Sequence, residues 1–293
     1  MKLALGTVQF GLPYGIANRQ GQVITAEAIA IVEYARSIGV DTLDTAAVYG
    51  DSEQRLGEIG VQTWKIISKL PPIPVGTADV GLWVRTSVER SLRLLRVHNL
   101  AGLLLHHPAD LLGASGALLQ RALLDIKASG LVGKIGVSIY SPAELDGLMK
   151  RFPVEMVQAP FNVLDQRILS SGWLSRLHDL GIEVHVRSIF LQGLLLLDRL
   201  ARPPQFSRWQ EIWRGWDEYL RASNQTPLEA CVRFASSPPT IARVVVGIDT
   251  RRQLEEIFGA LNGATLPLPY HLQCNDPHLL EPSRWKSLTP AAG

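Results

Sequence analysis

The chain contains few residues of the kind that hold disulfide-stabilised or zinc-binding proteins together. Its 293 residues include two cysteines, Cys231 and Cys274, which lie far apart and outside any C-x-x-C or Cys/His spacing. We therefore expect free thiols in a reducing compartment, and neither a disulfide framework nor a metal site.

Charge of one sign and long apolar runs are also scarce. The formal net charge is +2, without a basic block or an acidic tail, which argues against a nucleic-acid surface or a polybasic membrane anchor. The first residues, MKLALGTVQFG, lack the apolar core of a signal peptide, and Gln192 and Gly193 interrupt the apolar run 189–197. The sequence therefore favours a cytoplasmic enzyme that acts on a small molecule.

Short apolar segments alternate with helical patterns along the whole chain. The apolar segments predict strands at residues 3–5, 40–43, 64–68, 103–105, 135–137, 156–158, 183–186 and 243–246. Helical spacing predicts helices at residues 26–37, 52–56, 84–95, 116–129, 142–150, 171–180, 209–219, 227–236 and 251–261. Thr25 and Gly39 are expected to cap the first helix, and Asp51 or Ser52 the second.

This alternation predicts an α/β protein, a (β/α)8 TIM barrel in which residues 1–293 form a single domain. A longer loop and helix insertion is expected at about residues 198–225, and a proline-rich C-terminal loop at about residues 264–293. No G-x-G-x-x-G follows a predicted strand, and eight units that fill the chain favour a closed barrel over an open doubly wound sheet.

Titratable residues of complementary types follow consecutive predicted strands. Asp44 ends the second strand, Tyr49 lies in the loop after it, Lys69 ends the third strand and His106 follows the fourth. Polar residues also end three later strands: Ser138, Gln158 and Ser188. In a barrel the carboxyl ends of all strands meet at one face, so we expect these side chains to share one mouth. An ordinary tyrosine loses its proton only near pH ~10, so using it as an acid at neutral pH requires a nearby cation.

Five sequence blocks, in the order LDTAAVYG, ISKL, LLLHHP, IGVS and VQAPFN, resemble the motifs of the aldo-keto reductases, over essentially the full chain from LGTVQFG onward. The resemblance implies a barrel that binds a nicotinamide cofactor without a Rossmann domain. It implies reduction of an aldehyde or ketone to the alcohol, or the reverse reaction, by hydride transfer. Tyr49 would be the general acid, Lys69 and Asp44 a pair that stabilises its phenolate, and His106 the group that orients the carbonyl. His107 is a second candidate, but His106 directly follows the strand.

The same resemblance predicts the residues around the cofactor. Ser138 and Gln158 would bind the nicotinamide carboxamide, although Ile139 stands where many relatives carry Asn. Arg187 takes the place of an aromatic residue that often stacks on the nicotinamide. Gly193 in loop 189–194 would let backbone amides approach the pyrophosphate. The full predicted cofactor-binding set is Gly6, Thr7, Asp44, Ser138, Gln158, Arg187, Ser188, Phe190, Leu191, Gln192, Gly193, Gly247, Asp249, Thr250, Arg252, Gln253 and Glu256.

The segment VVGIDTRRQLEE resembles the part of the family that holds the adenosine end of the cofactor. Arg251 and Arg252 can pair with a 2′-phosphate. Two residues match those that meet the adenine: Gln253 and Glu256. Asp249 departs from the pattern because its carboxylate would repel that phosphate; in a purely structural role, Asp249 or Thr250 caps the helix. We predict NADPH as the cofactor, with NADH as the alternative.

Two other functions stay open on the sequence. Relatives with this fold act as channel partners, so a cofactor-binding regulatory or scaffold protein with little turnover is the main alternative. A lyase in which Lys69 forms a Schiff base is the other. Substrate choice is expected to depend on the region after Gly11, residues 198–223 and the tail from Ala264, with Tyr14 and Trp64 as pocket walls or core residues.

Overall fold

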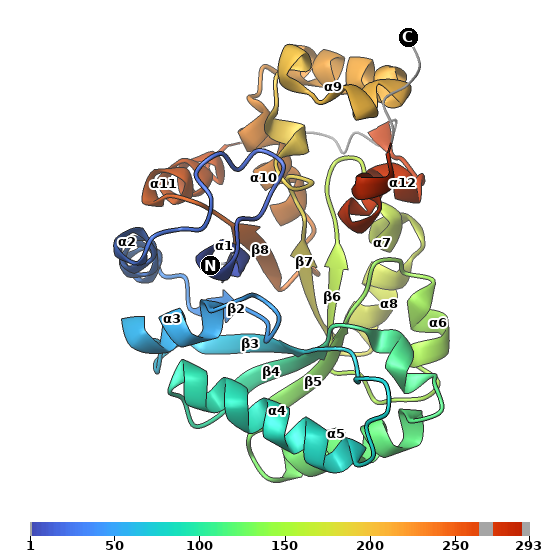
Figure 1. The fold of residues 1–293 in the computed structure, drawn as a ribbon. Coiled ribbons are helices and arrows are strands. Elements are labelled where there is room, and N and C mark those ends of the chain that lie inside the picture. Colours follow the sequence, from blue (N-terminus) through green and yellow to red (C-terminus); the bar gives the residue numbers. More distant parts are fainter. Residues whose placement is uncertain (1, 264–271, 289–293) are drawn as a thin grey trace.

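The computed structural model describes residues 2–263 and 272–288. Eight parallel strands close into a barrel in chain order, with β8 paired to β1 (Figure 1). The strands are β1 (Leu3–Gly6), β2 (Thr42–Asp44), β3 (Lys65–Leu70), β4 (Leu100–Leu105), β5 (Val132–Ser138), β6 (Met156–Pro160), β7 (Glu183–Arg187) and β8 (Arg243–Gly247). The predicted (β/α)8 TIM barrel is therefore confirmed.

Most of the α-helices lie around the outside of the strands (Figure 1), and their buried side chains are mainly apolar. The α-helices are α1 (Val8–Gly11), α2 (Thr25–Ser37), α3 (Ser52–Ile59), α4 (Val80–Leu95), α5 (Gly116–Ala128), α6 (Glu144–Leu148), α7 (Arg167–Ser170), α8 (Trp173–Asp179), α9 (Gln210–Ser223), α10 (Pro227–Ser236), α11 (Arg251–Ala260) and α12 (Pro277–Leu280). Short 3-10 helices are η1 (Pro108–Leu111), η2 (Leu194–Leu196), η3 (Arg199–Ala201), η4 (Pro204–Trp209) and η6 (Pro282–Ser287).

The inside of the barrel is filled by a small apolar layer. Ile67, Leu104 and Met156 are buried there, separated from the larger core between strands and helices. Gly102 and Gly136 leave room for this layer, because a Cβ at Gly102 would lie 2.9 Å from Ile67 Cδ1 and one at Gly136 2.8 Å from Leu104 Cδ2. The inside of the barrel is therefore a packed core at the level of these side chains.

Ion pairs close the opposite end of the barrel, where the strands begin. The Asp41 carboxylate lies 2.8 Å from Lys65 Nζ and 3.2 Å from Arg243 Nη2. Glu183 lies 2.5 Å from Lys134 Nζ and 2.7 Å from His185 Nε2. The Lys65 and Asp41 side chains are about half exposed, at 61% and 44%, so pairs of this kind add little to stability.

Several helices differ from their predicted boundaries, and two of these differences have a clear local cause. Helix α4 begins at Val80 instead of residue 84, because the Asp79 carboxylate accepts a hydrogen bond from Leu82 N at 2.9 Å and caps the helix there. The helix predicted at residues 171–180 is two helices, α7 and α8, separated at Gly172, whose φ of 76° interrupts helical geometry. Apolar periodicity did not reveal either feature, since both depend on single polar or glycine residues.

The two predicted caps of α2 are each displaced by one position, whereas the predicted N-cap position of α3 is confirmed at Asp51. Thr25 is the first residue of α2 and forms no capping bond, since Ile24 occupies the N-cap in an extended conformation. Gly39 follows the C-cap, with a left-handed φ of 82°. Asp51 is the N-cap of α3 without a side-chain cap bond, and Ser52 Oγ instead donates to Thr7 O at 2.9 Å. Ser52 therefore ties the helix to the loop after β1.

The segment at residues 198–225 contains η3, η4 and α9, and it packs against the described part of the C-terminal segment. Trp209 Nε1 donates to the Asp276 carboxylate at 3.0 Å, and the Phe206 and Trp285 rings meet edge-on with centroids 4.9 Å apart. Cys274 N donates to Leu164 O at 2.8 Å, which joins this segment to the loop after β6. The predicted C-terminal loop lies partly outside the described residues, at 264–271 and 289–293.

Candidate active site

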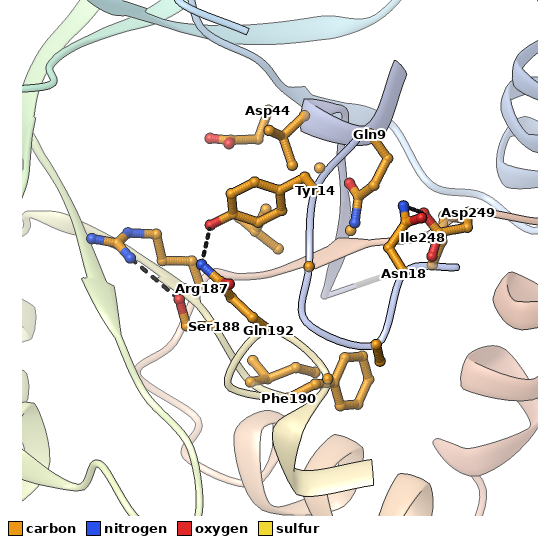
Figure 2. A pocket seen from close by; sticks show the side chains of 18 of the residues that line it. Gln9, Tyr14, Asn18, Asp44, Arg187, Ser188, Phe190, Gln192, Ile248 and Asp249 are labelled. Carbon is orange, nitrogen blue, oxygen red and sulfur yellow. Dashed lines mark hydrogen bonds between the residues drawn. The ribbon is translucent and has the colours of Figure 1, made fainter. Parts of the chain in front are cut away.

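A cavity of about 680 Å³ opens at the carboxyl ends of the strands. Its wall contains most of the residues that the sequence singled out, and Figure 2 shows several of them around the loop after β1. The predicted site residues in the wall are Gly6, Thr7, Asp44, Tyr49, His106, Ser138, Gln158, Arg187, Ser188, Phe190, Gln192, Gly193, Gly247, Asp249, Gln253 and Glu256. Four predicted residues lie outside the lining: Lys69, Leu191, Thr250 and Arg252.

A chain of buried hydrogen bonds runs beneath the cavity floor. Lys69 Nζ donates to Asp44 Oδ1 at 2.5 Å and to the Thr45 carbonyl at 2.9 Å. Gln158 Nε2 donates to the other Asp44 oxygen at 2.6 Å, and Ser138 Oγ lies 3.4 Å from Gln158 Oε1. The β5 and β6 strands set this last contact, because Ser138 and Gln158 are partners in their register. Asp44 is thus fixed from two sides.

The Lys69 ammonium group lies close to the Tyr49 ring. Lys69 Nζ lies 5.0 Å from the centroid of the Tyr49 ring, and the Lys69 side chain is 1% exposed. Burial alone lowers the pKa of Lys69, but the Asp44 carboxylate and Tyr49 outweigh that effect and raise the pKa above its ordinary value. Lys69 therefore carries a permanent positive charge at neutral pH, next to the phenol.

His106 faces the same ring. The Tyr49 and His106 rings meet edge-on, with centroids 6.0 Å apart. Burial, together with the nearby Lys69 and Arg187 charges, lowers the pKa of His106 to about 4. The imidazole is therefore neutral at neutral pH. His107 points elsewhere: it is exposed, and its Nδ1 lies 2.7 Å from the Asp110 carboxylate.

Two glycines hold the Tyr49 backbone against the loop after β1. A Cβ at Gly11 would lie 1.7 Å from the Tyr49 carbonyl oxygen, and one at Gly50 would lie 2.2 Å from Gly11 O. Gly50 also has a φ of 57°, in the left-handed region that favours glycine. The position of the phenol thus depends on a backbone contact that admits no side chain.

We expect Gly11→Ala to lower turnover about ten- to hundredfold, because the Tyr49 segment must move to accommodate the methyl group, and small displacements of a reacting group are costly. Cofactor affinity should change less, since most of the cavity wall is distant from this contact. Steady-state kinetics and a cofactor titration measure both quantities. Gly259→Ala is the matched control, because a Cβ at Gly259 meets nothing within 4 Å. Full turnover in Gly11→Ala would contradict this account.

Gln9 supplies an unsatisfied polar atom to the cavity wall. Its side chain is 7% exposed, and Oε1 has no hydrogen-bond partner among the described residues. The amide lies directly on Gly247, where a Cβ would approach Gln9 Nε2 to 2.6 Å. A buried acceptor without a partner is costly, so this atom fits a ligand that carries a donor such as a ribose hydroxyl.

The loop after β7 has an unusual backbone. Ser188, Leu191 and Gln192 have φ values of 60°, 48° and 54°, and Gly193 follows at 90°. The Leu191, Gly193 and Leu194 amides donate to carbonyl oxygens of the same loop. These three amides are therefore occupied within the protein, and Leu191 itself is buried in the core.

The loop after β1 crosses between this segment and the end of β8 (Figure 2). Ile16 N donates to Gln192 O at 3.1 Å, and Gln192 Nε2 donates to the Tyr14 hydroxyl at 3.0 Å. At the other side, Asn18 Nδ2 donates to Asp249 Oδ1 at 2.9 Å. Hydrogen bonds thus tie this loop to the loop after β7 on one side and to Asp249 after β8 on the other.

Helix α11 begins beside Asp249. Thr250 is the N-cap, and its hydroxyl accepts from Gln253 N at 3.2 Å, so Thr250 caps the helix and Asp249 does not. Burial raises the pKa of Asp249. The guanidinium groups of Arg251 and Arg252 point along the helix, toward carboxylates four residues away, at 2.8 and 2.9 Å.

Comparison with known proteins identifies the family of the chain. Residues 2–268 match the model of the aldo/keto reductase family. The chain belongs to the aldo/keto reductase family. The match covers the barrel from β1 through α11, and it agrees with the resemblance seen in the separate motifs around Asp44, Lys69 and His106.

Relatives of this aldo/keto reductase include an uncharacterized oxidoreductase of Mycobacterium bovis, 32% identical over 146 residues, which is 48% of this chain and 43% of that protein. An uncharacterized oxidoreductase of Mycobacterium tuberculosis matches to the same extent. The matched stretch spans less than half of these relatives. Among solved structures, the holo form of an aldo-keto reductase from Bacillus halodurans has a TM-score of 0.69 at 19% identity, covering 97% of this chain and 95% of that one. A glycerol dehydrogenase from Gluconobacter oxydans has a TM-score of 0.70 at 20% identity, covering 96% and 92%. These structures share the fold.

Several cavity residues of the reductase were not predicted. Gln9, Asn18 and Tyr140 are in its wall, and each follows the end of a strand. Position after a strand was the available signal for them, but polar and aromatic loop residues are too common for that signal to be selective. Trp64, which the sequence left as either wall or core, is 8% exposed and belongs to the core.

The described residues contain neither a metal-ligand cluster nor a membrane-spanning helix. No cluster of three or more His, Cys, Asp or Glu side chains suited to a metal ion occurs in ranges 2–263 and 272–288. Within the same ranges, no helix has both the length and the apolar character needed to cross a bilayer.

Proposed function

We propose that this aldo/keto reductase reduces an aldehyde or ketone to the alcohol, or catalyses the reverse reaction, with NAD(P)H. The observation that carries the proposal is the buried Lys69 ammonium, bonded to Asp44 and 5.0 Å from the centroid of the Tyr49 ring at the floor of a large cavity. When bound there, the nicotinamide supplies or accepts a hydride. The protein must then move one proton to or from the substrate oxygen.

Tyr49 is proposed as the acid that donates this proton. The Lys69 charge stabilises the phenolate that remains, and the low local polarity of a buried pair strengthens the effect. His106 is neutral at neutral pH, since its pKa is about 4, so it can donate one N–H to the carbonyl oxygen without carrying charge itself. The three groups thus have separate tasks: proton donation, charge stabilisation and orientation.

The cofactor is expected to extend along the cavity from Asp44 to Glu256. Ser138 and Gln158 would hold the carboxamide, and the unpaired Gln9 acceptor would take a ribose hydroxyl. The N-terminus of α11, with Gln253 beside it, would meet the adenosine phosphate end. NADPH remains the predicted cofactor, because Arg252 and Arg251 have side chains 85% and 54% exposed, so they are free to leave their weak pairs for a phosphate.

Asp249 is predicted to limit the preference for NADPH. Asp249→Asn should shift the ratio of NADPH to NADH affinity toward NADPH by about tenfold, which corresponds to about 1.4 kcal/mol, because it removes a carboxylate near the 2′-phosphate while its side-chain oxygen still accepts from Asn18. Equilibrium fluorescence titrations measure both affinities. Asp51→Asn, at an exposed carboxylate outside the cavity, is the control. An unchanged ratio would show that Asp249 does not face the phosphate.

A direct assay tests the proposed function. The purified protein is mixed with NADPH or NADH and a panel of aldehydes and ketones, and the loss of nicotinamide absorbance is followed. Differential scanning with each cofactor gives an independent measure, because a ligand that binds the folded state raises the unfolding temperature. Stabilisation by a cofactor together with carbonyl-dependent consumption of NADPH or NADH supports the proposal. The absence of both effects would overturn it.

The two alternatives make different predictions. A regulatory or scaffold protein would bind the cofactor tightly without turnover on any carbonyl. A Schiff-base lyase needs Lys69 as a free amine, but the raised pKa of Lys69 and its bond to Asp44 hold the ammonium form. Borohydride trapping of a carbonyl on Lys69 would support the lyase. The cytoplasmic location and the single-domain boundaries remain predictions.

A further inference from the structure

The Arg187 guanidinium is a positive charge in the cavity wall, and no carboxylate of the described residues forms an ion pair with it. Arg187 ends β7 and belongs to the wall that also contains Tyr49 and His106. Among residues 2–263 and 272–288, none of the ion pairs includes Arg187. The buried Asp165 carboxylate is already taken by Arg167, with two hydrogen bonds of 2.8 Å.

The guanidinium is held in a defined orientation. Arg187 Nη2 donates to Ile139 O at 3.0 Å and Nη1 to Ser188 Oγ at 3.2 Å. Its Cζ lies 4.9 Å from the centroid of the Tyr140 ring, which covers one face of the group. Two of the five N–H groups are used in these bonds, so others remain for a ligand. Stacking and two anchoring bonds fix the group in advance, which lowers the entropy lost on binding.

The charges of the cavity wall divide between its two ends. The described wall contains Asp44 and Arg187 at the Tyr49 end, and Asp249 and Glu256 beside α11. Lys69 neutralises Asp44, and His106 is neutral, so the catalytic end keeps the net charge of Arg187. Figure 2 shows the guanidinium directed away from the Asn18 and Asp249 side. An anion that enters this end finds an attractive charge near the groups that act on the carbonyl.

We propose that Arg187 binds an anionic group of the substrate, so that the preferred substrates are aldehydes or ketones bearing a carboxylate or a phosphate, or the corresponding hydroxy acids or hydroxy phosphates. This inference rests on the proposed function of the same site. Guanidinium groups bind both anions through paired N–H bonds. The Tyr14 hydroxyl, which accepts from Gln192, keeps its own proton to donate to the same anion.

The competing role for Arg187 is contact with the nicotinamide in place of a stacking aromatic ring. That role would affect the binding of the cofactor and the turnover of neutral and charged substrates alike. Substrate recognition instead affects the two classes unequally. Pairs of substrates that differ only in charge therefore separate the two roles.

The experiment compares matched carbonyl pairs with the native protein and two variants. The pairs are 4-carboxybenzaldehyde with 4-carbamoylbenzaldehyde, succinic semialdehyde with its amide, and glyceraldehyde 3-phosphate with glyceraldehyde. We expect kcat/KM to favour the charged member of at least one pair by tenfold or more, mainly through KM. Arg187→Met should bring that ratio near one and Arg187→Lys should keep part of it. Arg85→Met, which removes an exposed arginine of α4, should leave the ratio unchanged.

Preference for the carboxylate or for the phosphate pairs identifies the anion and supports the proposal in either case. A ratio near one in the native protein, or a preference that survives in Arg187→Met, overturns it while leaving the carbonyl reductase assignment intact. A drop of equal size for both members of every pair assigns Arg187 to the cofactor instead and also overturns it.

A binding measurement keeps the inference testable if no carbonyl is turned over, which is the failure of the proposed function. Benzoate, benzamide and inorganic phosphate are titrated calorimetrically into the protein with NADP⁺ present. Tenfold weaker binding of benzoate or phosphate to Arg187→Met than to the native protein supports the anion site. Equal binding to both, or equal binding of benzoate and benzamide, overturns it.

Discussion

Tyr49→Phe is expected to lower turnover about 10²- to 10⁴-fold, the range typical for removal of a positioned acid. The change deletes one oxygen and leaves the ring, so the edge-on contact with His106 and the position of Lys69 beside the ring are retained. Lys69 also keeps its bonds to Asp44 and Thr45. Cofactor affinity should therefore stay within about threefold of the native value. Steady-state kinetics with a fluorescence titration of the cofactor measure both.

Tyr34→Phe is the matched control, because it removes the hydroxyl of a tyrosine on α2 outside the cavity and leaves its ring under Arg251. Turnover in that variant should remain native. If Tyr49→Phe retains full activity, the acid has been assigned to the wrong residue. If it loses activity and cofactor binding together, the phenol positions the cofactor and the proton must come from another group.

The strands and the shared location of Asp44, Lys69 and His106 were predictable from the sequence, because both depend on short-range patterns. A buried parallel strand requires a continuous apolar run, and barrel closure then brings Asp44, Lys69 and His106 to one face whatever their separation in the chain. Register explains the finer contacts. Lys69 pairs with Leu104 across β3 and β4, two residues before His106, so strand pairing alone sets the two side chains near each other.

The loops were less predictable because their geometry depends on contacts between distant segments. In the cavity wall the Gln9 amide lies against Gly247, more than two hundred residues later, where the missing side chain leaves room for it. Asn18 contacts Asp249 because β1 pairs with β8 when the barrel closes, which brings the loops after these two strands together. Local patterns contain no information about such contacts. The sequence could indicate that these loops contribute to the site, but not which of their side chains do.

The charges within the cavity were also only partly predictable from local sequence patterns. The Asp44 and Lys69 pair was visible in the motifs, but the unpaired state of Arg187 depends on Asp165 being taken by Arg167, which is a property of the folded protein. The catalytic end is therefore positive through a residue that the motifs had assigned to the cofactor. Substrate charge and cofactor choice become separate questions, with Arg187 acting at one end and Asp249 at the other.

Lys69→Met is the second change with a large expected effect, because it acts on stability and turnover together. The Lys69 and Asp44 side chains are 1% and 5% exposed, and removal of one partner leaves a buried charge without its counter-ion. Such losses cost about 3–5 kcal/mol of unfolding free energy. Turnover should fall by at least about 10²-fold, since nothing then stabilises the Tyr49 phenolate. Denaturant unfolding and steady-state kinetics measure the two effects.

Lys65→Met is the matched control on the same strand, since its pair with Asp41 is exposed and should be worth less than about 1 kcal/mol. The raised pKa of Lys69 sets the pH window: its contribution to stability is complete below the pKa of an unfolded lysine and is lost as the pH rises through the higher folded value. The double variant Lys69→Met with Asp44→Asn separates the two roles. It should regain much of the stability, because no unpaired charge remains, without regaining turnover. Recovery of both would mean that the ammonium supports the fold alone, and that the chemistry at Tyr49 does not depend on its charge.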